Sequence, residues 1–280
     1  LFRSRLFIQK GGGRWYFMED KYPELGNLMP RDIVSREMHN VCTRDDCGGQ
    51  VFLDMTALSQ DVWNNRLKDL RSEIVRYLAL DPVKQPVPVS PGIHYFMGGL
   101  LAGEGHRTNI EDLYAAGECA CRYHGANRLG GNSMLGAVYG GRAAAASILS
   151  GGCRGSRSEP LLLGRVDGTQ KASLCVSPAF SKKLAKTLFD ALGIVRNPSD
   201  MQKALRSAEN SLYGGTEGLS SMERMHLELA RAMLMSAIAR KESRGAHYRI
   251  DYPKTREEYR KKTVSEYRDE EINISLQETD

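Results

Sequence analysis

Three side chains that can bind an anion lie on separate segments of the chain. Arg31 begins a predicted helix, His94 follows a proline-rich stretch, and Arg128 lies in a glycine-rich loop. An arginine can donate two parallel hydrogen bonds to a carboxylate, and a histidine can add another donor. Taken singly, Arg31 would be a surface residue and His94 a hydrogen-bonded core imidazole. Only the combination of the three favours an anion site.

The loop around Arg128, HGANRLGGNSMLGAVYGGR at 124–142, leads into a predicted helix. A helix N-terminus has unpaired N–H groups and a partial positive charge, which favour anions and electron-rich oxygens. Asn132 or Ser133 would cap this helix, and the glycines would let a ligand approach the backbone. The helix alone would fit a glycine-rich helix packed on a sheet without a ligand equally well.

A second polar group comes from LYAAGE, a predicted short strand that ends in Glu118. A carboxylate at the carboxyl end of a strand can accept hydrogen bonds from ribose hydroxyls. Taken alone, Glu118 would more often be a surface acid. A strand, a loop and a glycine-rich helix start in this order indicate an α/β arrangement that handles a nucleotide.

The remaining patterns predict the elements that position these groups. RLFIQ and RWYFM predict a hairpin around the glycines at 11–13, and prolines keep QPVPVSPGIHYFMGG extended. Further helices are predicted from PRDIVSREMHNVC, VWNNRLKDLRSEIVRYLAL, SMLGAVYGGRAAAASIL, FSKKLAKTLFDALGI and MERMHLELARAMLMSAIARKES, and further strands from GQVFLDMT and EINISL. The glycine pair at 151–152 should end the helix after the loop. A linker is predicted over 153–171, where glycine, serine and arginine predominate.

Composition narrows the function classes. The net charge of +5 comes without a cluster of cations and aromatics, which disfavours nucleic acid as a partner. No apolar run is long enough for a membrane span, and no signal-peptide pattern precedes the first strand. The six cysteines lack CxxC pairs and zinc-type spacing, so no metal site is predicted. We expect reduced thiols in a cytoplasmic protein.

Five stretches resemble the flavoprotein subunit of succinate dehydrogenase and fumarate reductase, in the order and approximate spacing of that family. They are RDIVSREM, VFLDMT, PGIHYFMGG, LYAAGECACRYHGANRLGGNSMLGAVYGGRAA and ARKESRGAHYRIDYP. The combination of HYFMGG with HGANRLGGNS is the specific one. L-Aspartate oxidase is similar and shares most of these stretches. Met97 and the glycines at 130–131 favour the dehydrogenase/reductase branch.

The resemblance implies FAD as cofactor, a dicarboxylate (succinate or fumarate) as substrate and a role in electron transport. Arg31 would protonate the fumarate carbon or take the proton from succinate, while His94 and Arg128 would hold a substrate carboxylate. Glu118 would hold the FAD ribose. The start of the helix would face the isoalloxazine ring; the implied flavin contacts there are Arg128, Asn132, Ser133, Met134 and Leu135.

The fold class implied is α/β plus α, in three parts. Residues 1–85 would form part of an α+β substrate-capping domain. Residues 86–152 would be the C-terminal part of a Rossmann-like FAD-binding domain, and residues 153–280 a helical bundle domain with a charged tail.

The sequence contains no GxGxxG segment for the FAD pyrophosphate and no match to the family's Thr-Glu region, whose glutamate relays a proton to the residue at Arg31. We therefore expect weak FAD binding by these residues alone. The expected partners are an N-terminal FAD-binding segment or chain and an iron–sulfur subunit, the latter with peripheral attachment at the inner face of a membrane. The alternatives are a truncated, non-catalytic remnant and an enzyme similar to L-aspartate oxidase.

Overall fold

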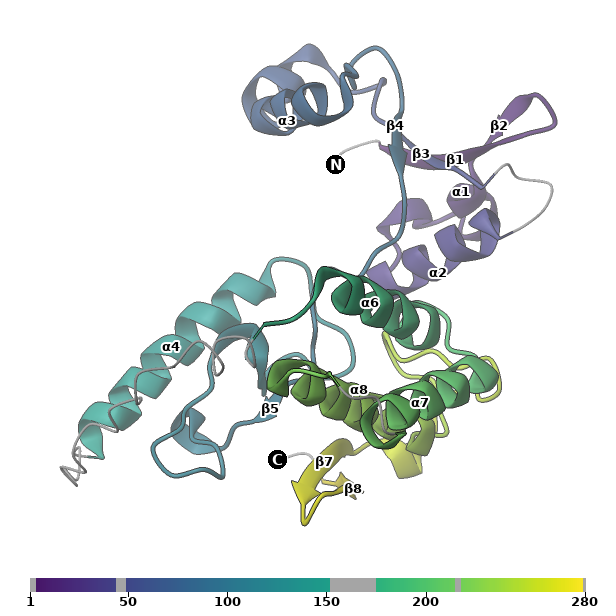
Figure 1. The fold of residues 1–280 in the computed structure, drawn as a ribbon. Helices are drawn as coiled ribbons and strands as arrows, with labels where there is room; N and C mark the ends of the chain where they lie inside the picture. Colours follow the sequence, from purple (N-terminus) through teal and green to yellow (C-terminus); the bar gives the residue numbers. More distant parts are fainter. Residues whose placement is uncertain (1–3, 44–48, 152–174, 215–217, 279–280) are drawn as a thin grey trace. The chain divides into compact units, whose positions relative to one another are not determined.

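The computed structural model describes residues 4–43, 49–151, 175–214 and 218–278. It divides into two compact units, Leu1–Gly92 and Ile93–Asp280 (Figure 1), here called the N-terminal and the C-terminal unit. Helices and strands both occur in each unit. No helix within the described ranges combines the length and the apolar character needed to cross a membrane.

The N-terminal unit is built on an antiparallel sheet of four strands in the order β2-β1-β3-β4. The strands are β1 (Arg5–Lys10), β2 (Gly13–Trp15), β3 (Val51–Asp54) and β4 (Val87–Val89). Gly11 and Gly12 connect β1 to β2, with φ angles of 58° and 79°. Two successive positive φ angles give the tight two-residue turn that matches strand twist. The predicted hairpin is therefore confirmed.

The second strand of the hairpin is shorter than predicted, because a helix begins at Phe17. Phe17 and Met18 are both fully buried in the same core, together with Ile8, Val41 and Val51. Neighbouring residues of a strand point to opposite faces of the sheet, so a strand could not bury both there. The helices in the described residues of this unit are α1 (Phe17–Lys21), η1 (Gly26–Leu28), α2 (Arg31–Cys42), η3 (Val62–Arg66) and α3 (Lys68–Leu78).

The helix predicted from Val62 onward is interrupted. A π-helical turn, η3, ends at Arg66, and Leu67 (φ −120°, ψ 18°) separates it from α3. Trp63, in the π-turn, is 1% exposed and packs in a small core with Met55 and Val87. We infer that the break lets this large ring reach that core while α3 runs on as an exposed helix.

The C-terminal unit begins with a two-stranded parallel pairing of β5 (Leu100–Leu101) with β6 (Ala120–Cys121). The strand predicted over LYAAGE is wrong. Tyr114 makes only an isolated bridge with Arg107, and the chain then turns into the 3-10 helix η5 (Gly117–Cys119). Gly117 adopts φ 80°, a left-handed conformation that interrupts an extended strand. Another 3-10 turn, η4 (Glu104–His106), precedes this segment, and α4 (Asn132–Ser150) follows it.

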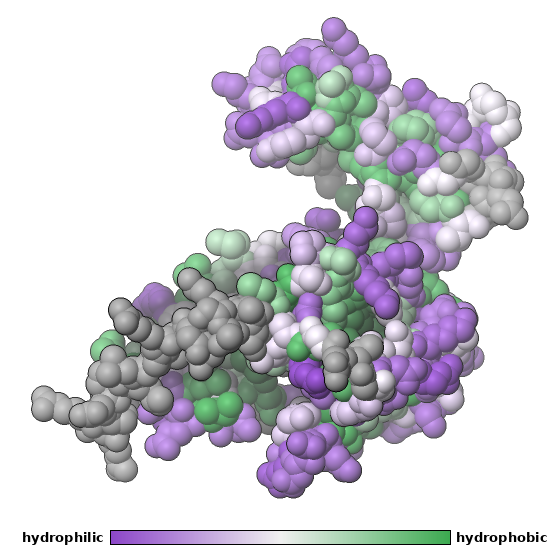
Figure 2. Space-filling model, viewed as in Figure 1, coloured by the Kyte–Doolittle hydropathy of each residue, from purple (hydrophilic) through white to green (hydrophobic). Residues whose placement is uncertain are grey.

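Three helices form the main body of this unit: α6 (Pro178–Leu192), α7 (Pro198–Tyr213) and α8 (Ser221–Ala239). Serine or asparagine side chains cap their N-termini, and Ser220 forms a capping box with Glu223. The predicted helices at α6 and α8 are confirmed, whereas α7 was not predicted separately. Met201 and Leu234 lie in the core between them. Figure 2 shows hydrophilic residues over α7 and apolar ones deeper between the helices.

The chain closes with η6 (Glu257–Tyr259) and the antiparallel hairpin of β7 (Lys262–Arg268) and β8 (Glu271–Gln277). The predicted closing strand corresponds to β8, and its partner β7 was missed. The predicted linker over 153–171 lies outside the described residues.

Candidate functional site

No side chain of the described residues caps the N-terminus of α4. Its N-cap is Gly131, with φ 84° and no side-chain hydrogen bond to the first turn. The prediction that Asn132 or Ser133 caps the helix is therefore wrong: both are helical residues of the first turn. Gly131 takes the left-handed φ that a residue with a side chain would resist. The Asn132 N–H donates to the Leu129 carbonyl at 3.2 Å, and the amides that follow it in the first turn can serve an external acceptor.

Small residues let α4 pack closely on the preceding loop. Gly140 faces His106, whose Cε1 atom lies 2.8 Å from the place where a Cβ would be. His106 is 1% exposed, and its Nδ1 lies 2.7 Å from the Ala115 carbonyl oxygen. Because a carbonyl only accepts, Nδ1 carries the proton and Nε2 accepts from the Tyr123 hydroxyl. This contact fixes the middle of α4.

Arg128 is held over an aromatic ring. Its guanidinium carbon lies 4.6 Å from the Tyr95 ring centroid, and its Nη1 donates to the Leu129 carbonyl at 3.1 Å. Tyr95 packs edge-on against His124, with 5.5 Å between ring centroids, and His124 fills the space left by Gly136 on α4. The stack thus fixes the guanidinium near the loop that opens α4.

The Arg128 guanidinium keeps donor capacity. Its Nε is buried and has no hydrogen-bond partner within the described part of the chain. A buried N–H without a partner is costly, so such a group usually marks a place for an acceptor. Sequence reasoning named Arg128 but gave no role to Tyr95 or His124. The aromatic residues in IHYF and YHGANR were the available signal.

Glu118 connects two of the sequence motifs. Its side chain is exposed, and Oε1 accepts from the Phe96 backbone N–H at 2.8 Å. The backbones cross closely here, because a Cβ on Gly99 would lie only 2.3 Å from the Cys119 carbonyl oxygen. The HYFMGG stretch therefore lies against GECA, and Glu118 holds the two together from an exposed position.

Two predicted site residues stand apart from these contacts. His94 is exposed at the start of the segment that carries Tyr95. Arg31 belongs to the N-terminal unit, where it is exposed as the first residue of α2, behind the N-cap Pro30. The C-terminal unit thus brings together the segments of His94, Glu118 and Arg128 with the start of α4.

The outward face of α4 is apolar. Met134 and Leu135, next to its N-terminus, are 70% and 67% exposed. The same face continues through Val138 and Tyr139. Large apolar side chains exposed side by side usually mark a surface that another group covers.

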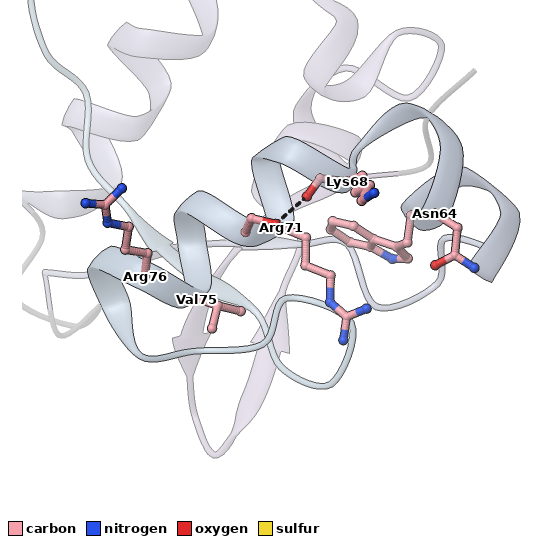
Figure 3. Close-up of a pocket in the computed structure, with 7 residues that line it drawn as sticks. Asn64, Lys68, Arg71, Val75 and Arg76 are labelled. Carbon is pink, nitrogen blue, oxygen red and sulfur yellow. Dashed lines mark hydrogen bonds between the residues drawn. The ribbon is translucent and has the colours of Figure 1, made fainter.

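A shallow groove on α3 contains none of the predicted site residues (Figure 3). Arg71, on its wall, forms two hydrogen bonds with Asp81, so its charge is already paired within the fold. The lining residues are Trp63, Asn64, Lys68, Arg71, Ser72, Val75 and Arg76. The groove therefore has no assigned ligand.

Two family models match the chain: an FAD binding domain over residues 4–134 and the fumarate reductase flavoprotein C-terminus over residues 217–280. The succinate dehydrogenase flavoprotein subunit of Bacillus subtilis is 31% identical, over 94% of this chain and 50% of that protein. An L-aspartate oxidase of Rhodospirillum rubrum is 33% identical, over 81% of this chain and 79% of that sequence.

A solved Escherichia coli quinol fumarate reductase superposes with a TM-score of 0.78 at 27% identity, over 97% of this chain and 54% of that one. The chain thus spans about half the length of the Bacillus and Escherichia coli relatives. These similarities cover both units and the motifs on which the resemblance rested. The chain belongs to the succinate dehydrogenase/fumarate reductase flavoprotein family, whose cofactor is FAD and to which L-aspartate oxidases are related.

Proposed function

We propose that the protein interconverts succinate and fumarate with FAD, and that this chain supplies the substrate-carboxylate and flavin-ring contacts. One observation carries the proposal: Arg128 is fixed on Tyr95 with an unsatisfied Nε, beside the uncapped start of α4. FAD, when bound, supplies hydride transfer at its N5 position.

The donor set of the C-terminal unit fits FAD. The Ser133 amide, in the uncapped first turn, suits the electron-rich edge of an isoalloxazine ring, whereas the Asn132 N–H already donates to the Leu129 carbonyl at 3.2 Å. Met134 and Leu135 offer apolar surface next to this amide. Glu118, with one oxygen on the Phe96 amide, keeps acceptor capacity for ribose hydroxyls. We therefore assign the ring and ribose contacts to these residues.

Arg128 and His94 would bind a carboxylate of the substrate. A guanidinium held in one orientation can form two parallel hydrogen bonds with a carboxylate at low entropic cost. Positive charge at this point stabilises the negative charge that develops on the carbon next to that carboxylate during reduction of fumarate. The aromatic stack under Arg128 keeps this charge in place before the substrate arrives.

Arg31 would exchange the proton with the substrate carbon. It is exposed and makes no ion pair with any residue that the structure describes. An arginine side chain stays protonated in proteins, so it can only relay a proton that a neighbouring acid replaces at once. The acid expected from the resemblance has no counterpart in these 280 residues.

The second candidate is L-aspartate oxidation, favoured by the Rhodospirillum rubrum relative, of which the chain covers 79%. The third outcome is a non-catalytic remnant. A solved relative described as a quinol–fumarate reductase with menaquinol molecules supports an electron partner, and the family resemblance implies an iron–sulfur subunit with peripheral attachment to the inner face of a membrane. The chain itself would then be cytoplasmic.

The test is anaerobic reduction of fumarate by the FAD-loaded protein, meaning these residues joined to the expected N-terminal FAD-binding segment, with a reduced viologen dye as electron donor. Arg31→Lys and Arg128→Ala should each lower turnover by about a hundredfold or more while flavin stays bound. Arg142→Ala, at an exposed position of α4, is the matched control and should leave turnover unchanged. Near-normal turnover in both site variants refutes the assigned roles. Oxidation of L-aspartate with no activity on fumarate selects the second candidate.

A further inference from the structure

We propose that the turn Arg244–His247 is a brace that positions the Arg128 loop, with Gly245 and Glu242 as its positioning residues. This inference rests on the proposed function only for its link to substrate binding. The contacts that carry it lie entirely within the C-terminal unit, between the segment after α8 and the loop before α4.

The brace touches the loop through backbone. The Ala246 N–H donates to the Ala126 carbonyl at 3.0 Å. A Cβ on Gly245 would lie 2.3 Å from the Ala126 oxygen and 3.0 Å from the Asn127 Cβ. Real Cβ atoms do not approach backbone this closely, so only glycine permits the contact. The loop position fixed in this way lies two residues before Arg128.

The turn is closed by its own hydrogen bonds. The Arg244 N–H donates to the His247 carbonyl at 2.8 Å, and the His247 N–H donates back at 3.1 Å. Gly245 adopts φ 56°, a conformation that glycine takes without strain. The geometry at Ala126 is therefore set by a two-residue turn with little freedom of its own.

Glu242 ties this turn to the body of the unit. Its carboxylate is fully buried and accepts from Arg244 Nε at 2.9 Å and from Arg240 Nη2 at 2.6 Å. The other oxygen accepts from Arg244 Nη2 and from the Arg256 N–H. Hydrogen bonds to charged groups in a buried network hold their partners in one arrangement. Arg244 thus cannot shift without breaking this network.

Arg249 joins the same segment to the end of α8. Its Nη1 donates to the carbonyls of Ala237, Ile238 and Arg240, which the helix leaves without partners. Its other nitrogens form two hydrogen bonds with Asp251. The brace is thereby anchored on a long helix, and the Arg128 loop takes its position from that helix.

The first experiment measures hydrogen exchange of the full protein with Gly245→Ala and Gly245→Asn. Asparagine tolerates left-handed φ but carries the Cβ, so both variants should push the loop away. Amides of residues 124–131 should exchange about tenfold faster or more, while those of α8 remain unchanged. Gly11→Ala is the matched control, since it has nearly the same φ of 58° and no neighbour within 4 Å.

The second measurement connects the loop to the site. Binding of malonate, a dicarboxylate that cannot be reduced at a double bond, is measured by calorimetry on the FAD-loaded protein. Gly245→Ala should weaken malonate binding and raise the KM for fumarate by up to about a hundredfold, with a smaller change in kcat. Glu242→Gln, which keeps the shape and removes the charge, should act in the same direction.

Unchanged exchange of residues 124–131 in Gly245→Ala overturns the proposal. Equal loosening of α8 overturns it as well, because the segment would then act on the stability of the whole unit. Faster loop exchange in a protein that neither binds malonate nor reduces fumarate supports the brace and refutes the proposed function. The two failures are therefore distinguishable.

Discussion

Alanine at Gly140 should destabilise the C-terminal unit, whereas alanine at the next residue, Gly141, should stabilise it. Both glycines lie inside α4. A Cβ at Gly140 would lie 2.8 Å from Cε1 and 3.2 Å from Nε2 of His106, while a Cβ at Gly141 would have no neighbour within 4 Å. The pair therefore isolates one contact at constant helix propensity.

The magnitudes follow from three contributions. Replacing glycine by alanine in a helix interior stabilises by up to about 1 kcal/mol, and at the exposed Gly141 nothing opposes this gain. At Gly140 the methyl group overpacks a buried contact, which costs about 1–3 kcal/mol. Displacing His106 also strains its hydrogen bonds to Ala115 and Tyr123, at about 1 kcal/mol or more. We expect a net loss of about 2 kcal/mol at Gly140.

The difference of about 3 kcal/mol between the two variants is measurable by urea unfolding followed by circular dichroism. It corresponds to about 1 M or more in the urea midpoint and to roughly 6–12 °C in Tm. In a His106→Ala background the alanine at Gly140 should no longer be unfavourable, which a double-mutant cycle tests. Equal stability of the two single variants, or a penalty that persists without the His106 side chain, refutes the reasoning.

Three further outcomes are expected. Burial and the neighbouring Arg196 lower the pKa of His247 to about 4. As the pH falls, the His247 imidazole of the unfolded chain binds a proton before that of the folded chain does, so the free energy of unfolding should fall by about 3 kcal/mol between about pH 6.5 and pH 4. In His247→Gln the urea midpoint should depend less on pH over this range. An unchanged pH dependence of the midpoint would contradict the assignment. Arg249→Lys removes the planar guanidinium that donates to carbonyls at the end of α8 and to Asp251, and should lower the free energy of unfolding by about 2 kcal/mol. A change in the urea midpoint smaller than its experimental error would show that these hydrogen bonds contribute little. These 280 residues on their own should bind FAD weakly, because they contain no GxGxxG segment; flavin titration followed by fluorescence checks this, and a stoichiometric yellow protein would be the contrary result.

The elements that could be predicted from the sequence are those specified by residues close together in the chain. A run of glycines between two short apolar segments predicts the β1–β2 hairpin, and the structure has its turn at Gly11 and Gly12. Stripes of apolar residues predict α2, α6 and α8, which form. The strand predicted to end at Glu118 was wrong because Gly117 adopts a left-handed conformation, and the predicted cap of α4 was wrong because Gly131, which has no side chain, occupies the N-cap position.

The features that the sequence did not predict depend on tertiary contacts between distant segments. Tyr95 supports Arg128 only because two loops meet, and no local pattern specifies that meeting. The same holds for the contact between His106 and Gly140, because no pattern in the sequence predicts that the His106 ring packs against this glycine. In β7 the alternation of KTVSEYR is mostly polar, so its pairing with β8 gives a weak signal.

The contact between Ala246 and Ala126 also has a consequence during protein synthesis. The Arg128 segment leaves the ribosome long before its support does, at about 5–20 residues per second. Until Ala246 emerges, roughly ten seconds later by this rate, water must satisfy the Ala126 carbonyl. A nascent chain therefore carries every residue of the Arg128 loop before the contact that fixes the loop can form, and the loop takes its final position only after Ala246 has left the ribosome.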